Sequence, residues 1–64
     1  MKLEDAIEFL NNMANNYEED SEVWYMEALD EPGDYERSMH YSNSCGKKAD
    51  AIRTVLNALS TLSD

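Results

Sequence analysis

Residues 47–62 read KKADAIRTVLNALSTL, and this stretch decides the fold. Apolar side chains recur in it at alternating spacings of three and four residues, at Ala49, Ile52, Leu56 and Leu59. A second apolar row widens the stripe: Ala51, Val55, Ala58 and Leu62. No proline interrupts the pattern, so it predicts an amphipathic helix. One helix cannot hide so wide a stripe, and residues 1–46 must supply the opposing surface.

The same periodicity recurs near the start of the chain. The row of apolar and small side chains consists of Leu3, Ile7, Leu10, Ala14, Tyr17, Ser21, Trp24 and Ala28. Its unbroken phase favours one helix from about residue 3 to about residue 30, with Trp24 in the core. Asparagines after residue 10 are weak helix formers, however, and Asp20 with Ser21 can cap a new helix. A break near residues 16–21, which would give a three-helix bundle, is therefore the alternative.

The segment DEPGD, residues 30–34, is the clearest turn signal in the sequence. Proline disfavours the helical conformation for the residue before it, Gly33 tolerates positive φ, and Asp34 can cap the helix that follows. A second helical pattern then runs in one phase from Asp34 to Leu62. Gly46 lies inside this second helix, where it costs about 1 kcal/mol relative to alanine.

These patterns predict an all-α fold in which residues 1–64 form a single domain. The predicted architecture is an antiparallel hairpin of helices over about 3–30 and 34–62, which places Trp24 opposite Tyr41. At its middle, Lys47 and Lys48 are expected near Glu18 and Glu19. Small side chains there let the backbones approach closely. Because a two-helix hairpin leaves its apolar stripes half covered, we expect it to dimerise into a four-helix bundle.

Negative charge is gathered in the front of the chain. The net charge is −9, from fourteen acids and five bases. Residues 1–36 hold twelve of the acids and one base, whereas residues 37–64 hold two acids and four bases. Direct binding to nucleic acid needs a cluster of Lys and Arg, which this chain lacks. The charge instead favours a protein partner with a basic surface.

No catalytic, cofactor-binding or metal-binding motif is present in the sequence. His40 and Cys45 are the only histidine and cysteine, and together they cannot supply the four ligands of a zinc site. We interpret His40 as a solvated surface residue and Cys45 as a small packing residue. The runs of acids lack the alternating ligand spacing of a calcium loop. We therefore expect no enzymatic activity, no cofactor and no metal.

The apolar segments are too short for a membrane protein. The longest unbroken apolar run, Val23–Met26, is far below the roughly 20 residues of a membrane span. The first residues turn acidic at once and do not resemble a signal peptide. A lone cysteine fits a reducing compartment. We expect a soluble cytoplasmic protein, in the host cytoplasm if it is virus-encoded, with no membrane contact.

An aromatic and methionine patch, VWYMEAL, occupies residues 23–29. In a continuous helix Tyr25, Met26 and Leu29 project away from the core stripe, whereas a break near Asp20 would let the segment bury both of its sides. Exposed aromatics and Met anchor protein interfaces, and a charged rim steers the partner. The predicted partner-binding residues are Glu22, Tyr25, Met26, Glu27, Leu29, Asp30, Glu31, Tyr35 and Glu36.

The predicted function is a non-catalytic acidic interaction protein that binds and inhibits or regulates a basic, nucleic-acid-binding protein. Carboxylates spaced along a helix imitate the charge of a phosphate backbone. Small virus-encoded inhibitors of host defence nucleases have this general character, and the comparison is one of analogy. The alternative is a structural homodimeric four-helix module with no inhibitory role, whose acidity only keeps it soluble.

Overall fold

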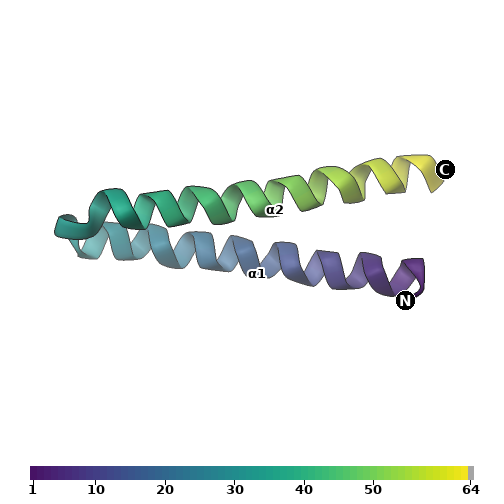
Figure 1. The fold of residues 1–64 in the computed structure, drawn as a ribbon, viewed down its shortest axis with the longest axis horizontal. Helices are drawn as coiled ribbons and strands as arrows, with labels where there is room; N and C mark the ends of the chain where they lie inside the picture. The colour runs from purple at the N-terminus through teal and green to yellow at the C-terminus, as the bar shows by residue number, and fades with distance from the viewer. Residues whose placement is uncertain (64) are drawn as a thin grey trace.

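The computed structural model describes residues 1–63 and shows an antiparallel hairpin of two long helices (Figure 1). Helix α1 covers Leu3–Asp30, a short 3-10 helix η1 covers Pro32–Asp34, and helix α2 covers Tyr35–Ser63. The turn lies at one end of the molecule and both ends of the chain lie at the other. The predicted all-α hairpin is confirmed, with helix bounds close to those expected.

Helix α1 runs without a break through residues 16–21, so the three-helix alternative is wrong. The Ser21 hydroxyl donates to the carbonyl oxygen of Ser42 at 2.8 Å, and the Ser42 hydroxyl donates to the carbonyl oxygen of Ser21 at 2.8 Å. The two Oγ atoms are 3.2 Å apart. Because Ser21 is engaged across the hairpin, it does not cap a new helix. Contacts with α2 outweigh the weak helix propensity of the asparagines before it.

The turn differs in detail from the prediction. The backbone amide of Asp34 donates to the carbonyl oxygen of Glu31 at 3.0 Å. The backbone amide of Tyr35 donates to the carbonyl oxygen of Pro32. Gly33 does not adopt positive φ, because a 3-10 turn has helical dihedral angles throughout. The amide of Tyr35, the first residue of α2, is thus bonded to the backbone of η1 and not to the Asp34 carboxylate.

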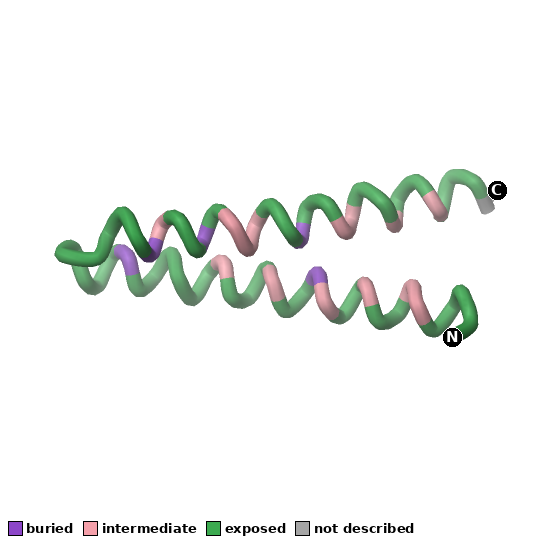
Figure 2. The backbone as a smooth tube through the Cα atoms, viewed as in Figure 1, coloured by how far each residue is buried: buried purple, intermediate pink, exposed green. Residues whose placement is uncertain are grey.

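Small side chains form the contact between the two helices. Among the described residues, the buried ones are Ala14, Ala28, Ser38, Ser42 and Ala49, drawn in purple in Figure 2. No large side chain is fully buried in this part of the chain. Alanine and serine let two backbones approach closely, and we call this row of five residues the small-residue seam. Large side chains are consequently displaced to the flanks of the seam.

The register of the hairpin agrees with the predicted pairing of Trp24 and Tyr41. Their ring centroids are 4.9 Å apart and the rings are tilted by 34°. Gly46 also faces α1, because a Cβ added to it would meet the Ser21 Oγ at 3.5 Å. Trp24 was expected in the core, but 37% of it is exposed. The reason is that Tyr41, the ring it packs against, lies at the edge of the seam and is itself 39% exposed.

The hairpin opens towards the chain ends. Figures 1 and 2 show the helices closest near the turn and further apart near the termini. The half-buried residues of the open end include large aliphatic ones: Ile7, Leu10, Ile52, Leu56 and Leu59. Larger side chains between two helices hold their axes further apart than alanine and serine do. Side-chain size along the interface therefore accounts for the divergence.

An elongated shape leaves much surface in water. The molecule measures 48 × 18 × 13 Å with a radius of gyration of 14.6 Å, against about 11 Å for a compact domain of this length. Its accessible surface is 5120 Å², whereas a compact monomer of 7.3 kDa exposes about 4,200 Å². Large apolar side chains account for part of this surface: Leu3, Phe9, Val23, Tyr25, Met26, Leu29, Tyr35, Val55 and Leu62.

The small-residue seam predicts that a side chain larger than alanine is not tolerated at Ala14, which is 0% exposed. Ala14→Leu adds three carbons to a fully buried position between the helices, and overpacking of this kind costs about 1–3 kcal/mol. We expect the free energy of unfolding in urea to fall by that amount.

Ala58→Leu is the matched control, because Ala58 is an exposed helical alanine outside the seam, and the same substitution is made there. We expect this control to change the unfolding free energy by no more than about 0.5 kcal/mol. Equal effects of the two substitutions would show that the helices are not held close at Ala14.

Candidate protein-docking surface

All nine predicted partner-binding residues lie on the surface. The exposed fractions of Tyr25, Met26 and Leu29 are 45%, 58% and 54%. These side chains stay outside because α1 is continuous, so the segment cannot turn to bury both of its sides. The alternative in which residues 23–29 form the interior of a three-helix bundle is therefore excluded by the fold.

Four carboxylates and two apolar side chains line a shallow groove on the outer surface of α1: Glu19, Glu22, Val23, Met26, Glu27 and Asp30. Their spacing of three and four residues puts them on one face of the helix. We call this feature the acidic groove. Glu22, Met26, Glu27 and Asp30 belong to the predicted set. Glu19 and Val23 were missed, although the three-and-four spacing from Met26 identifies both of them in the sequence.

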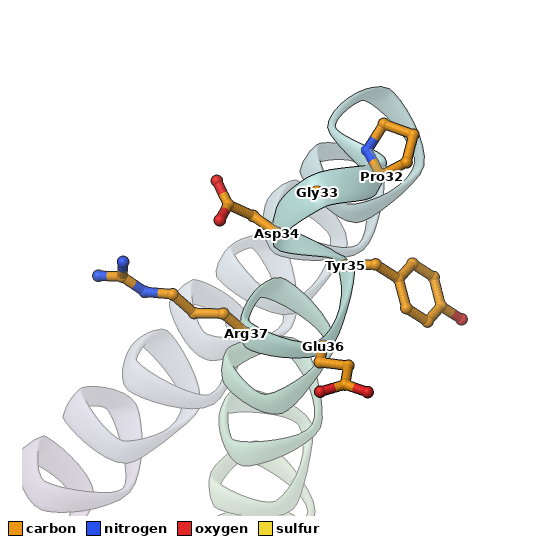
Figure 3. Close-up of a pocket in the computed structure, with 6 residues that line it drawn as sticks. All are labelled: Pro32, Gly33, Asp34, Tyr35, Glu36 and Arg37. Atoms are coloured by element: carbon orange, nitrogen blue, oxygen red, sulfur yellow. The ribbon is translucent and has the colours of Figure 1, made fainter.

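The other predicted residues divide into two groups. Tyr25 and Leu29 belong to α1 but lie outside the acidic groove. Tyr35 and Glu36 line a depression at the turn together with Pro32, Gly33, Asp34 and Arg37. Figure 3 shows the Asp34 and Arg37 side chains on one side of this turn and the Tyr35 ring on the other. Glu31 joins α1 to η1, so it connects the two groups along the chain.

An aromatic cluster lies beside the turn, on the flank of the small-residue seam. Tyr41 is its centre: its ring contacts Trp24, and the His40 ring stands edge-on to it with centroids 5.9 Å apart. The guanidinium carbon of Arg37 lies 5.9 Å from the Tyr41 ring centroid, a cation–π distance. Arg37 thus interacts with an aromatic ring and not with a carboxylate among the described residues.

One ion pair links the helices in the described part of the chain. Arg53 Nε donates to Glu18 Oε1 at 2.6 Å, and Arg53 Nη2 donates to Asn15 Oδ1 at 2.7 Å. The hydrogen bond from Arg53 holds the pKa of Glu18 below its ordinary value, and the same bond raises the pKa of Arg53. Of the acidic side chains in residues 1–36, only Glu18 therefore forms an ion pair within the described residues.

The lysines that were predicted to lie near Glu18 and Glu19, Lys47 and Lys48, make other contacts. Neither lysine forms an ion pair within residues 1–63. The Lys48 ammonium lies 5.4 Å from the centroid of the Tyr17 ring, and Arg53 pairs with Glu18 instead. Helical position explains the difference: Lys48 and Arg53 leave α2 on opposite sides of the seam, and Glu18 leaves α1 on the Arg53 side.

The remaining reactive residues are separated from one another. The described residues contain no group of three or more His, Cys, Asp or Glu side chains placed to hold a metal ion. His40 is exposed, and Cys45 is a half-buried free thiol. Across residues 1–63, neither helix has an apolar stretch long enough to cross a membrane.

Comparison with known proteins identified no relative of this chain. No protein-family model matches the chain, and searches of curated proteins and of solved structures gave no match.

The ion pair of Glu18 predicts a pH-dependent effect of Glu18→Gln on stability. Because the folded-state pKa of Glu18 is lowered from 4.5, the contribution of the pair is present above that value and is lost as pH falls through the lowered pKa. The difference in urea midpoint between the wild-type protein and Glu18→Gln should be larger at about pH 7 than at about pH 2.

Glu22→Gln is the control, since Glu22 is exposed and forms no ion pair within the described residues. Glu22→Gln should change the urea midpoint only through the change in net charge. If Glu18→Gln and Glu22→Gln show the same pH profile, the Arg53 pair does not contribute in solution.

Proposed function

We propose that this protein is a non-catalytic acidic interaction protein that binds a basic, nucleic-acid-binding protein and inhibits or regulates it. The acidic groove is the observation that supports the proposal best. Val23 and Met26 are 62% and 58% exposed there, and the four carboxylates beside them form no ion pair within residues 1–63. An exposed apolar centre with an unneutralised charged rim is typical of a docking surface.

The density of acids along α1 supports the analogy with nucleic acid. Beyond Glu18, which is paired with Arg53, residues 19–30 hold five acids in twelve residues, which is about 18 Å of helix at 1.5 Å per residue. That is one negative charge per roughly 3.6 Å, close to the value of about 3.4 Å along one DNA strand. A surface that binds phosphates through Lys and Arg would therefore meet a similar linear charge on α1.

The groove also indicates what the partner surface must present. Cations alone would satisfy the rim but leave Val23 and Met26 in water. A complementary surface places an apolar side chain against these two residues and Lys or Arg side chains against Glu19, Glu22 and Glu27. The rings of Tyr25 on α1 and Tyr35 at the turn are exposed and add contact area outside the groove, because Tyr supplies large contact area in protein interfaces.

By the same analogy, we propose a role among small virus-encoded inhibitors of host defence or nucleic-acid enzymes, acting in the host cytoplasm. The mechanism is competition: the acidic helix occupies the site at which the enzyme binds phosphates. Such binding is electrostatic and weakens as salt rises.

A homodimeric four-helix module without an inhibitory role is the second candidate. The observation in its favour is the accessible surface of 5120 Å², which exceeds that of a compact monomer by about 900 Å². In this candidate the acids serve solubility only. A module of this kind would be recovered alone from a lysate at every salt concentration.

Charge reversal tests the docking function. The double substitution Glu27→Lys, Glu31→Lys should abolish capture of a basic protein from host lysate, because it places two cations against a cationic surface. Capture by the wild-type protein should be strong at about 50 mM salt and weak at about 200 mM. The captured protein, once purified, should lose its binding to nucleic acid when the wild-type protein is added.

Glu4→Lys, Glu8→Lys is the matched control, since it makes the same change in net charge at the other end of α1. Circular dichroism should show that both variants keep the helical signal. The proposed docking function is contradicted if the Glu27→Lys, Glu31→Lys variant still captures the basic protein. It is also contradicted if the control variant loses capture to the same extent.

A further inference from the structure

The two sides of the hairpin differ in polarity near the chain ends. One side carries polar groups: Glu18 and Asn15 of α1 contact Arg53 of α2 there. On the other side Leu10, Ala51 and Val55, with Ile52, line an apolar surface groove. Helical spacing extends this surface along α1 and α2. We call it the open-end face, and its main residues are Phe9, Leu10, Met13, Ala51, Val55 and Leu62.

Most of the open-end face is exposed, and none of its six named residues is charged. The exposed fractions of Phe9, Val55 and Leu62 are 55%, 55% and 82%. No ionisable side chain other than Tyr17 occurs in residues 9–17, and none occurs in residues 54–62. These two segments belong to opposite helices at the same end of the hairpin. In a chain with a net charge of −9, an uncharged region of this length is the least repulsive place for self-association.

Charge is distributed unevenly along the hairpin as well. Residues 15–47, at the turn end, hold nine acids and two bases. Residues 1–14 hold three acids and one base, and residues 48–64 hold two of each. The net charge is thus −7 for the turn end, −2 for residues 1–14 and zero for residues 48–64. A second copy meets far less repulsion at the open end than at the turn.

We propose that the open-end face binds a second copy of this chain, in a two-fold symmetric dimer whose turns point in opposite directions. Opposite orientation keeps the two turn ends apart, whereas the same orientation would place a net charge of −7 beside another of −7. The half-buried side chains of Leu10 and Ile52 then complete their burial against the partner's Phe9 and Val55. This inference deepens the dimer candidate above and is independent of the basic partner.

The elongated hairpin leaves surface that a partner could cover. The excess accessible surface is about 900 Å² per copy relative to a compact monomer, and a standard interface buries about 800 Å² on each partner. The shape allows it too, because the hairpin is 48 Å long and only 18 Å and 13 Å across. Side-by-side packing of two hairpins gives a four-helix arrangement of ordinary proportions.

Sedimentation velocity on the full chain tests the proposal. The wild-type protein should dimerise in the micromolar range, and Val55→Glu should raise the dissociation constant at least about tenfold, because the symmetric interface would bury two unpaired charges. Asn57→Glu is the matched control: Asn57 is exposed, lies two residues along the same helix, and takes the same added charge. It should leave the dissociation constant within about threefold of the wild-type value.

Circular dichroism separates loss of the dimer from loss of the fold, and Phe9→Ser provides a second interface variant without added charge. A wild-type protein that stays monomeric overturns the dimer itself. A dimer that persists in Val55→Glu and in Phe9→Ser overturns the assignment to this face only. Val55→Glu should also keep any capture of a basic protein, so failure of this inference and failure of the docking function are distinguishable.

Spin labels test the orientation. Asp34→Cys in a Cys45→Ser background places one label at each turn. Opposite turns predict a distance between labels that is comparable to the 48 Å length of the hairpin or greater. A short distance between the two labels would overturn the proposed orientation.

Discussion

Close approach of the two backbones at Ser21 and Ser42 constrains the rest of the hairpin. Each serine hydroxyl donates to the carbonyl oxygen of the other residue, and the Oγ atoms are 3.2 Å apart. Alanines continue the seam on both sides of this contact, so no bulky group separates the helices there. Bonds with such short side chains form in one register only. The rest of the hairpin, including the position of Trp24 against Tyr41, follows from that register.

Because the seam consists of small residues, it leaves the large apolar side chains on the surface of the hairpin. Alanine and serine bury little apolar area, and the large apolar side chains must remain partly in water. They gather in two places of different character. Near the turn, Val23 and Met26 lie among carboxylates in the acidic groove. Near the chain ends, Leu10 and Val55 line a surface without charge. The same packing therefore produces one surface suited to a cationic partner and another suited to a second copy.

Periodicity in the sequence was sufficient to predict the helices and their register, because apolar spacing reports which face of a helix is covered. The periodicity could not identify contacts that depend on the direction in which a side chain leaves its helix. Lys48 and Glu18 lie at similar heights in the hairpin, yet they leave the helices on opposite sides, and Glu18 pairs with Arg53. Likewise the spacing that placed Trp24 in the core could not show that Tyr41 covers only part of it.

A disulfide between residues 21 and 42 tests the close approach of the helices most directly. In the triple variant Ser21→Cys, Ser42→Cys, Cys45→Ser, the two thiols would replace hydroxyls whose oxygens are 3.2 Å apart, a separation compatible with a disulfide. Mild oxidation should give an intramolecular bond in a monomeric chain, as judged by mass spectrometry, whereas cysteines at 21 and 38 should oxidise much more slowly. If the pair at 21 and 42 stays reduced, or forms bonds only between chains, the helices do not meet at the small-residue seam.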